Sequence, residues 1–253
     1  MTIGKQLNKL CKMSLDYVLI GSDTNPYYFD FWPTVSKVWS QVFKVKPVLG
    51  LISDEDSEIY EDQFGLVKKF KKVEGIDIGL QSQIVRFYLA NFLEGNCLIS
   101  DIDMLPLSKN YFEGTCSRLN SENMVIHSSD NPECLRKNMY PMCYVAAKSQ
   151  VFKNVFDLNL SWEEFCNLLH NRNETWYTDQ KYLFEKVNQY NEINKNVIFL
   201  KRGWNGPADR RIDRINWRYN PERVNSGFYI DSHLLRPFAQ YQNEINNLVN
   251  LLY

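Results

Sequence analysis

The sequence has no apolar run long enough to cross a bilayer, and residues 1–13 are too polar for the core of a secretory signal peptide. No Cys-x-x-Cys pair occurs: the six cysteines stand apart, at positions 11, 97, 116, 134, 143 and 166, which gives little support for a zinc or redox site. Basic and acidic residues are nearly equal in number, 29 against 30, so neither sign of charge is in marked excess. The clustered basic surface that nucleic-acid binding requires is therefore not expected. We expect a protein of a reducing, cytosol-like compartment with neither a membrane span nor a nucleic-acid partner.

What the sequence does have is enough apolar material for one domain, with 253 residues of which 44% are hydrophobic. Leu15–Ile20 and Pro47–Ile52 predict two strands, and Pro26–Phe43 predicts a helix between them. Strand, helix and strand in this order form a right-handed βαβ unit with parallel strands. A nucleotide would lie across the carboxyl ends of these strands. A Rossmann dinucleotide site is not expected, since its Gly-x-Gly-x-x-Gly motif is missing.

The most informative stretch is Leu98-Ile99-Ser100-Asp101-Ile102-Asp103, where a short apolar run leads into two carboxylates one residue apart. The segment before it, Gln81–Leu93, repeats apolar residues with helical spacing, and Gly95 is a suitable helix stop. An apolar run of this length after a helix predicts a buried strand. Burying Asp is unfavourable without a compensating cation or donor. We therefore expect the pair at the carboxyl end of that strand, where open α/β sheets bind ligands.

Two carboxylates at a strand end form a hard-oxygen site for Mg²⁺ or Mn²⁺ and, through the metal, for a diphosphate. Asp-x-Asp alone is a weak signal, because it also occurs in turns and solvated loops. Its setting is more specific: a helix bearing the basic residue Arg86, a glycine, an apolar strand, then the carboxylate pair. This block resembles the central part of nucleotide-sugar-dependent glycosyltransferases with the GT-A fold. It is similar in particular to small GT-A glycosyltransferases of large DNA viruses such as the chloroviruses. The likeness covers about a dozen positions and elsewhere rests on scattered motifs.

The resemblance implies the fold class and the layout of the chain. We expect an α/β GT-A fold, with a mixed, mainly parallel sheet flanked by helices, in a single domain with a C-terminal loop and helix. The nucleotide-binding half would span about residues 14–107 and the acceptor half about 108–237, with the C-terminal helix at about 238–253.

The resemblance also implies a metal site. Asp101 and Asp103 would bind Mn²⁺ or Mg²⁺, and Asp101 would also touch the ribose of the donor. His233 would complete the set, since several retaining GT-A families take a third ligand from a late histidine. Imidazole suits Mn²⁺ better than Mg²⁺. The alternative for His233 is a structural or solvated side chain.

Three further residues would bind the donor, a nucleoside-diphosphate sugar. Arg86 would contact its sugar or phosphate, and an ion pair within the fold is the alternative interpretation. Ser22 and Asp23 follow the first strand, whose end contacts the nucleoside in GT-A enzymes. A simple turn explains these two residues about as well.

The block from Trp176 to Phe184 contains the pair Asp179-Gln180. Many GT-A transferases carry an Asp-Gln or Glu-Asp pair at this place, with the acidic group at the reacting centre. Asp179 would then deprotonate an acceptor hydroxyl or stabilise positive charge on the sugar ring. The alternative is that it only complements the dipole of a helix that begins there.

Residues 201–221 lack periodicity, and a loop of this length in a compact domain is usually functional or disordered. Five residues of this loop could cover a bound donor, with arginine meeting the diphosphate: Trp204, Arg210, Arg211, Trp217 and Arg218. A surface loop held by its tryptophans is the equal alternative.

Further elements complete the expected fold. We expect an irregular, polar segment over 108–123, and strand character over 224–237. The remaining expected strands are Met124–Ile126, Tyr140–Ala147 and Val197–Leu200, and the resemblance implies that the second of these lies antiparallel beside the Asp-x-Asp strand. Helices are expected at Ser149–Phe156, from the capping box Ser161–Glu164 to His170, and at Phe238–Leu252.

These inferences predict a metal-dependent glycosyltransferase (a hexosyl- or deoxyhexosyltransferase). It would move a sugar from a nucleoside-diphosphate sugar, with UDP as the commonest nucleotide, to a hydroxyl of a glycan, protein or small molecule. The late histidine favours retention of configuration. The location would be cytoplasmic, in the host cytoplasm if the chain is viral.

Two alternatives stay open. A metal-dependent nucleotidyltransferase or phosphatase also uses paired aspartates, but the glycine- and lysine-rich loop or the early Asp-x-Asp of those classes is missing. A non-catalytic GT-A-like module that binds a carbohydrate or a partner is the other. The co-occurrence of Asp101, Asp103 and His233 speaks against it.

Overall fold

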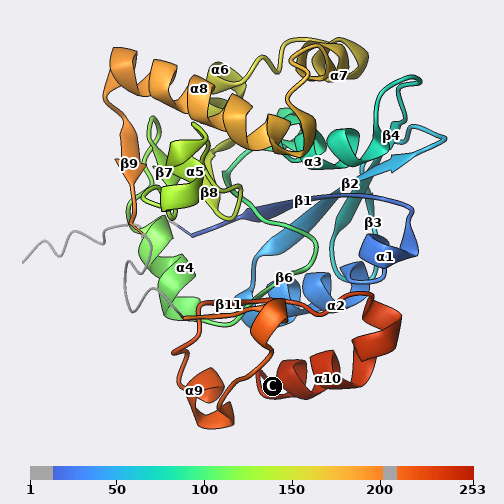
Figure 1. Cartoon of the computed structure of the whole chain (residues 1–253), viewed down its shortest axis with the longest axis vertical. Helices are drawn as coiled ribbons and strands as arrows, with labels where there is room; N and C mark the ends of the chain where they lie inside the picture. The colour runs from blue at the N-terminus through green and yellow to red at the C-terminus, as the bar shows by residue number, and fades with distance from the viewer. Residues whose placement is uncertain (1–13, 202–209) are drawn as a thin grey trace, which may run out of the picture.

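A computed structural model describes residues 14–201 and 210–253 of the chain. An eight-stranded sheet runs through the middle of the molecule in the order β3-β4-β2-β1-β5-β8-β7-β9 (Figure 1). Only β3 and β8 run against the other six strands, so the sheet is mixed and mainly parallel, as predicted. Its strands are β1 (Tyr17–Asp23), β2 (Lys46–Ser53), β3 (Tyr60–Glu61), β4 (Leu66–Lys71), β5 (Asn96–Ile99), β7 (Met124–Ile126), β8 (Val145–Lys148) and β9 (Val197–Phe199).

Helices cover both faces of this sheet, which gives three layers (Figure 1). Side chains alternate between the faces along a strand. In β1, Val18 and Ile20 enter one apolar cluster, whereas Leu19 enters the other. The first cluster packs against α1 (Pro26–Phe29), α2 (Trp32–Lys37), α4 (Lys109–Cys116) and α10 (Phe238–Asn250). The second packs against α3 (Ile78–Tyr88), α6 (Ser149–Val155), α7 (Trp162–His170) and α8 (Thr178–Asn194). Among the described helices, none has the length and apolar character to traverse a bilayer.

Helix α3 approaches the sheet closely because two glycines lie beneath it. Gly21 of β1 and Gly50 of β2 are paired in register. A Cβ atom on Gly21 would lie 2.1 Å from the backbone oxygen of Ser82, and one on Gly50 would lie 2.7 Å from Cγ2 of Val85. The absence of both Cβ atoms therefore fixes how near α3 sits to β1 and β2.

A second, three-stranded sheet lies beside the carboxyl ends of the main one. It consists of β6 (Met104–Pro106), β11 (Asp231–His233) and β10 (Arg211–Ile212), in the order β10-β11-β6. Strand β6 directly follows the Asp-x-Asp motif, and β11 pairs with it antiparallel, with His233 opposite Met104. This pairing brings the late histidine next to Asp103, 130 residues earlier in the chain (233 minus 103).

The predicted elements are largely confirmed. The βαβ unit is present with β1 and β2 parallel, and β8 runs antiparallel to β5, as expected. The capping box of Ser161 and Glu164 opens α7. The expected helix over Pro26–Phe43 is divided into α1, α2 and a π-helical segment, Val38–Phe43.

Three expectations were wrong in detail. Residues 108–123 contain α4, because the buried side chains of Tyr111, Phe112, Thr115 and Cys116 form one face of a helix. Strand character over 224–237 is limited to β11, because α9 (Pro221–Asn225) occupies the start of that region. The strand expected from Tyr140 begins only at Val145.

Candidate functional site

A cavity of about 580 Å³ opens at the carboxyl ends of β1 and β5, beside β11. This is the edge at which open α/β sheets bind ligands. Seven predicted site residues line it, from five separate segments of the chain: Ser22, Asp23, Arg86, Asp101, Asp103, Asp179 and His233.

Arg86 lies at the centre of this group and bridges two carboxylates. Its Nη1 donates to Asp101 Oδ1, and its Nη2 donates to Asp179 Oδ2 at 2.7 Å. The Nε atom donates to the backbone oxygen of Gln83 in the preceding turn of α3, 2.9 Å away. The side chains of Arg86 and Asp179 are only 6% and 2% exposed. The guanidinium therefore joins the strand-end motif to the start of α8 inside the fold.

The carboxylates around Arg86 differ in their affinity for protons. Burial acts to raise the pKa of Asp101, but the Arg86 guanidinium and a hydrogen bond with Cys143 outweigh it and leave that pKa below its usual value. Burial raises the pKa of Asp179 to about 6, against the opposing effect of Arg86. The cavity thus holds one firmly ionised carboxylate and one that titrates closer to neutrality.

Asp103 is held by a different set of cations. Its Oδ2 accepts a hydrogen bond from Nη2 of Arg214 at 2.6 Å, while Nε of Arg236 and Nε2 of His233 each lie 3.7 Å from the same oxygen. Burial, together with the Asp101 carboxylate, raises the pKa of Asp103 to about 6. The backbone oxygen of Asp103 accepts from the N–H of Leu234, 2.9 Å away, which ties the motif to the end of β11.

The predicted metal ligands belong to chemical types that bind divalent cations. Two carboxylates and an imidazole are a donor set for Mn²⁺, and Asp101, Asp103 and His233 face the same cavity. As they are arranged here, no three His, Cys, Asp or Glu side chains within 14–201 and 210–253 form a cluster that could hold a metal ion. The reason is visible at each carboxylate, since arginines hold both Asp101 and Asp103. The metal set remains a prediction.

The first-strand residues lie where predicted. Ser22 is buried and donates to the backbone oxygen of Asp23 at 2.9 Å, and Asp23 accepts from the N–H of Asn25 at 3.0 Å. Asp23 thereby forms the turn that the alternative interpretation supposed. Both residues nevertheless line the cavity, so the turn and a contact with a ligand are compatible.

Arg210 does not reach the cavity. Its Nη2 donates to the backbone oxygen of Gly227 at 2.9 Å, and its guanidinium lies over the ring of Phe228. The next residue, Arg211, lines the cavity instead. Neighbouring residues of an extended segment point to opposite sides, which explains why Arg211 and not Arg210 lines the cavity. Of the other residues predicted from this loop, Trp217 and Arg218 do not line the cavity, and Trp204 lies outside the described residues.

Sequence reasoning assigned no role to Tyr144, Arg214, Asp231 or Arg236. Arg211, which it named as a residue that could cover the donor, forms a bidentate ion pair with Asp231, with both N–O distances 2.7 Å, and Tyr144 donates to the same carboxylate at 2.8 Å. Arg214 and Arg236 converge on Asp103. The only available signal was that Arg236 follows His233 by three residues. The other pairs join segments far apart in the chain and leave no local pattern.

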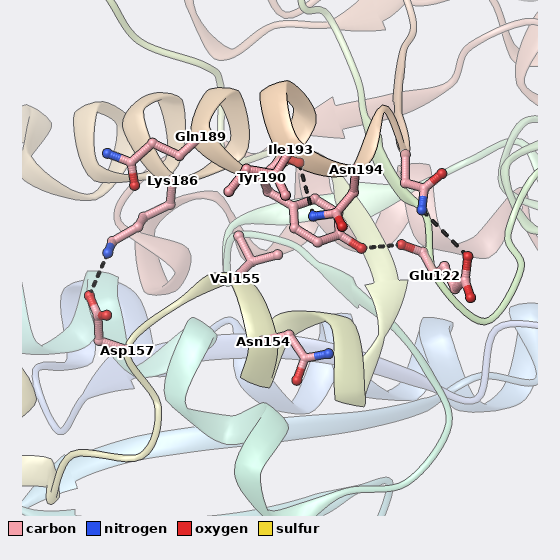
Figure 2. A pocket seen from close by; sticks show the side chains of 10 residues that line it. Glu122, Asn154, Val155, Asp157, Lys186, Gln189, Tyr190, Ile193 and Asn194 are labelled. Atoms are coloured by element: carbon pink, nitrogen blue, oxygen red, sulfur yellow. Dashed lines mark hydrogen bonds and ion pairs between the residues drawn. The ribbon is translucent and has the colours of Figure 1, made fainter.

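A second hollow, of about 610 Å³, lies between α6, α8 and the segment before β7 (Figure 2). Because β7 is parallel to β1, Glu122 lies at the amino ends of the strands, away from the first cavity. Its polar groups bond to one another: Lys186 pairs with Asp157 at 2.9 Å, and Tyr190 donates to the backbone oxygen of Glu122. None of the predicted site residues that the structure describes lines it. The first cavity is therefore the candidate active site.

The chain has a GT-A fold, as its sheet order, layers and strand-end cavity indicate. Among solved structures it resembles that of the galactosyltransferase LgtC in complex with donor and acceptor sugar analogs. The TM-score is 0.51 and the identity 9%, over 94% of this chain and 95% of that one. It also resembles a glycosyltransferase involved in glycosylation of the major capsid of the chlorovirus PBCV-1, with a TM-score of 0.51 and 10% identity over 92% and 99% of the two chains. At these identities the likeness concerns the fold. No protein-family model and no curated protein sequence matches the chain.

Proposed function

We propose that this protein is a glycosyltransferase that moves a sugar from a nucleoside-diphosphate sugar to an acceptor hydroxyl. The observation that supports it best is the bridge from Arg86 to Asp101 and Asp179, in the cavity at the carboxyl ends of the strands. This bridge joins the motif expected to face the diphosphate to the carboxylate expected at the reacting centre. A fold shared with two glycosyltransferases of known structure agrees with the proposal.

On the donor side, Ser22 and Asp23 would hold the nucleoside, and Arg86 the sugar or a phosphate. UDP is the nucleotide we propose. Asp101, Asp103 and His233 would hold Mn²⁺ or Mg²⁺. When bound, such an ion would neutralise the charge that develops on the leaving diphosphate.

On the acceptor side, Asp179 faces the cavity from the first turn of α8. Its pKa of about 6 lies near the range in which a carboxylate serves best as a general base. In an inverting reaction Asp179 would take the proton of the acceptor hydroxyl. In a retaining reaction, which His233 favours, it would stabilise positive charge on the sugar ring. We keep the prediction that the protein acts in a cytoplasm, on a glycan, protein or small-molecule acceptor.

Titration calorimetry against a panel of UDP- and GDP-sugars, with and without Mn²⁺, tests this proposal. We expect one donor to bind in the presence of Mn²⁺, and Asp103→Ala to weaken that binding at least about tenfold, because it removes a ligand of the metal–diphosphate unit. Asp157→Ala is the matched control: it removes the same side chain from the hollow of Figure 2 and should leave binding unchanged. If no nucleotide sugar binds to the folded protein at saturating Mn²⁺, the glycosyltransferase proposal is wrong.

A further inference from the structure

Asp103 is the point at which several cationic groups of the cavity converge. One oxygen, Oδ2, has Arg214 as its hydrogen-bond donor, with Arg236 and His233 a little further away. The other carboxylates, Asp101 and Asp179, share Arg86. These three carboxylates are thus paired with three guanidinium groups. The negative charge that they could offer to a dication is already balanced by arginines of the chain.

Buried guanidinium atoms beside Asp103 lack acceptors. Within the part of the chain that the structure describes, Nε and Nη1 of Arg214 and Nε of Arg236 have no hydrogen-bond partner. Buried polar atoms are normally paired. The acceptor group that matches a guanidinium fork in shape and charge is a carboxylate or a phosphate. The surroundings of Asp103 are therefore richer in donors than one carboxylate can satisfy.

Two tyrosines fix the side chain of Arg236 at the wall of the cavity. Its guanidinium lies 5.4 Å and 5.1 Å from the ring centres of Tyr27 and Tyr28, and its Nη1 donates to the Tyr28 hydroxyl at 2.6 Å. The side chain is 25% exposed and lines the cavity, whereas that of Arg214 is 13% exposed and is not among the residues that line it. Arg236 is thus positioned to contact an entering anion, while Arg214 donates a hydrogen bond to the Asp103 carboxylate.

We propose that Arg214 and Arg236 act as an arginine lock on Asp103, so that a divalent cation binds only together with the diphosphate. The inference rests on the proposed function of this cavity. A cation that arrives alone meets a carboxylate already paired and two adjacent positive charges. A diphosphate supplies the missing negative charge and competes for the donors of Arg236, which lines the cavity, so that Asp103 can exchange its arginine partners for the cation. By linkage, the cation strengthens nucleotide binding by the same factor.

The test is the affinity of the protein for Mn²⁺, measured by calorimetry alone and at saturating UDP, with GDP as a parallel series. We expect the nucleotide to tighten Mn²⁺ binding at least about tenfold. Arg214→Met and Arg236→Met should each tighten the binding of Mn²⁺ alone about threefold or more, because each removes a positive charge beside Asp103. Arg136→Met, on the exposed surface of α5 (Pro132–Arg136), is the matched control and should change nothing.

The outcomes separate this inference from the proposed function. The lock is disproved if the wild-type protein binds Mn²⁺ equally well without nucleotide, or if nucleotide binding is as tight in EDTA as in Mn²⁺. It is also disproved if both arginine variants, shown by thermal unfolding to be folded, keep the wild-type affinity for Mn²⁺ alone. If neither UDP nor GDP binds under any condition, the proposed function fails and the lock fails with it.

Discussion

At the scale of single residues, Arg86 shows that one charged side chain can form ion pairs within the fold and still lie where it could contact a ligand. The sequence allowed either a contact with the donor or an ion pair within the fold. The structure shows the ion pairs, with partners 15 and 93 residues away, inside the cavity where a donor would lie. A planar guanidinium can hold two carboxylates at fixed angles, which a lysine cannot do. The structural pairing therefore sets the orientation of both acidic groups that the proposed chemistry uses.

Asp179 leads to a prediction about pH and stability. Its pKa in the folded protein is about 6, above the usual 3.8, so between these values the native state binds the proton more tightly than the unfolded chain. The stability that this group contributes is fully present below pH 3.8 and is lost as the pH rises through about 6. Asp179→Asn removes this dependence. From pH 4 to pH 7 the unfolding free energy of wild type should therefore fall relative to that of the variant, by at most about 3 kcal/mol.

Denaturant unfolding at several pH values measures this difference directly. Asp54→Asn, at a position whose side chain is 82% exposed, controls for the loss of a charge elsewhere. Curves of unfolding free energy against pH that stay parallel for wild type and Asp179→Asn would contradict the account of this carboxylate.

At the scale of elements, the close packing of α3 on β1 and β2 positions Arg86. Gly21→Ala would place a methyl group against the backbone oxygen of Ser82, and the helix would have to move. Overpacking of this kind typically destabilises a protein by about 1–3 kcal/mol. We expect such a loss in denaturant unfolding, together with weaker nucleotide binding, because Arg86 moves with α3.

Gly50→Ala provides a matched comparison. Its added methyl group meets the two γ-carbons of Val85 rather than backbone, so Val85→Ala should restore part of the lost stability in the double variant. The same second substitution should do less for Gly21→Ala, where the backbone contact of 2.1 Å remains. Equal rescue of both glycine variants would show that the side chain of Val85, not the backbone of α3, limits the approach.

The elements that the sequence predicted are those with a strong periodic signal. Long apolar repeats located α3 and α10, and apolar runs located β1, β2 and β5. Helix α4 was missed because its polar residues, Lys109 and Asn110 among them, mask a short buried face. Strand character was expected over 224–237, but β11 has only three residues and includes Asp231 and His233, so neither length nor hydrophobicity marks its bounds. Its pairing with β6 depends on tertiary contacts that no local window contains.

At the scale of the whole molecule, the site exists because the sheet brings distant segments to one edge. The motif residues themselves were predictable, since Asp101 and Asp103 follow an apolar strand whose direction the βαβ unit fixes. The two arginines at Asp103, Arg214 and Arg236, were not, because the contact between Arg214 and Asp103 spans 111 residues and depends on the second sheet. Arg211 rather than Arg210 faces the cavity for the same kind of reason, since the orientation of one short strand decides it. The acidic residues at strand ends can thus be inferred from the sequence, whereas the arginines that pair with them can be identified only from the folded structure.

The most direct test of the central claim is a crystal structure of the protein grown with UDP and Mn²⁺. The account predicts the nucleoside at Ser22 and Asp23, the diphosphate between Arg236 and the Asp101–Asp103 motif, and an ion bound to Asp103 and His233. It predicts in addition that the contact between Arg214 and Asp103, 2.6 Å in the structure described above, is longer or broken. Nucleotide bound in the hollow of Figure 2, or no nucleotide in crystals whose cavity is open to solvent, would contradict the assignment of this cavity as the active site.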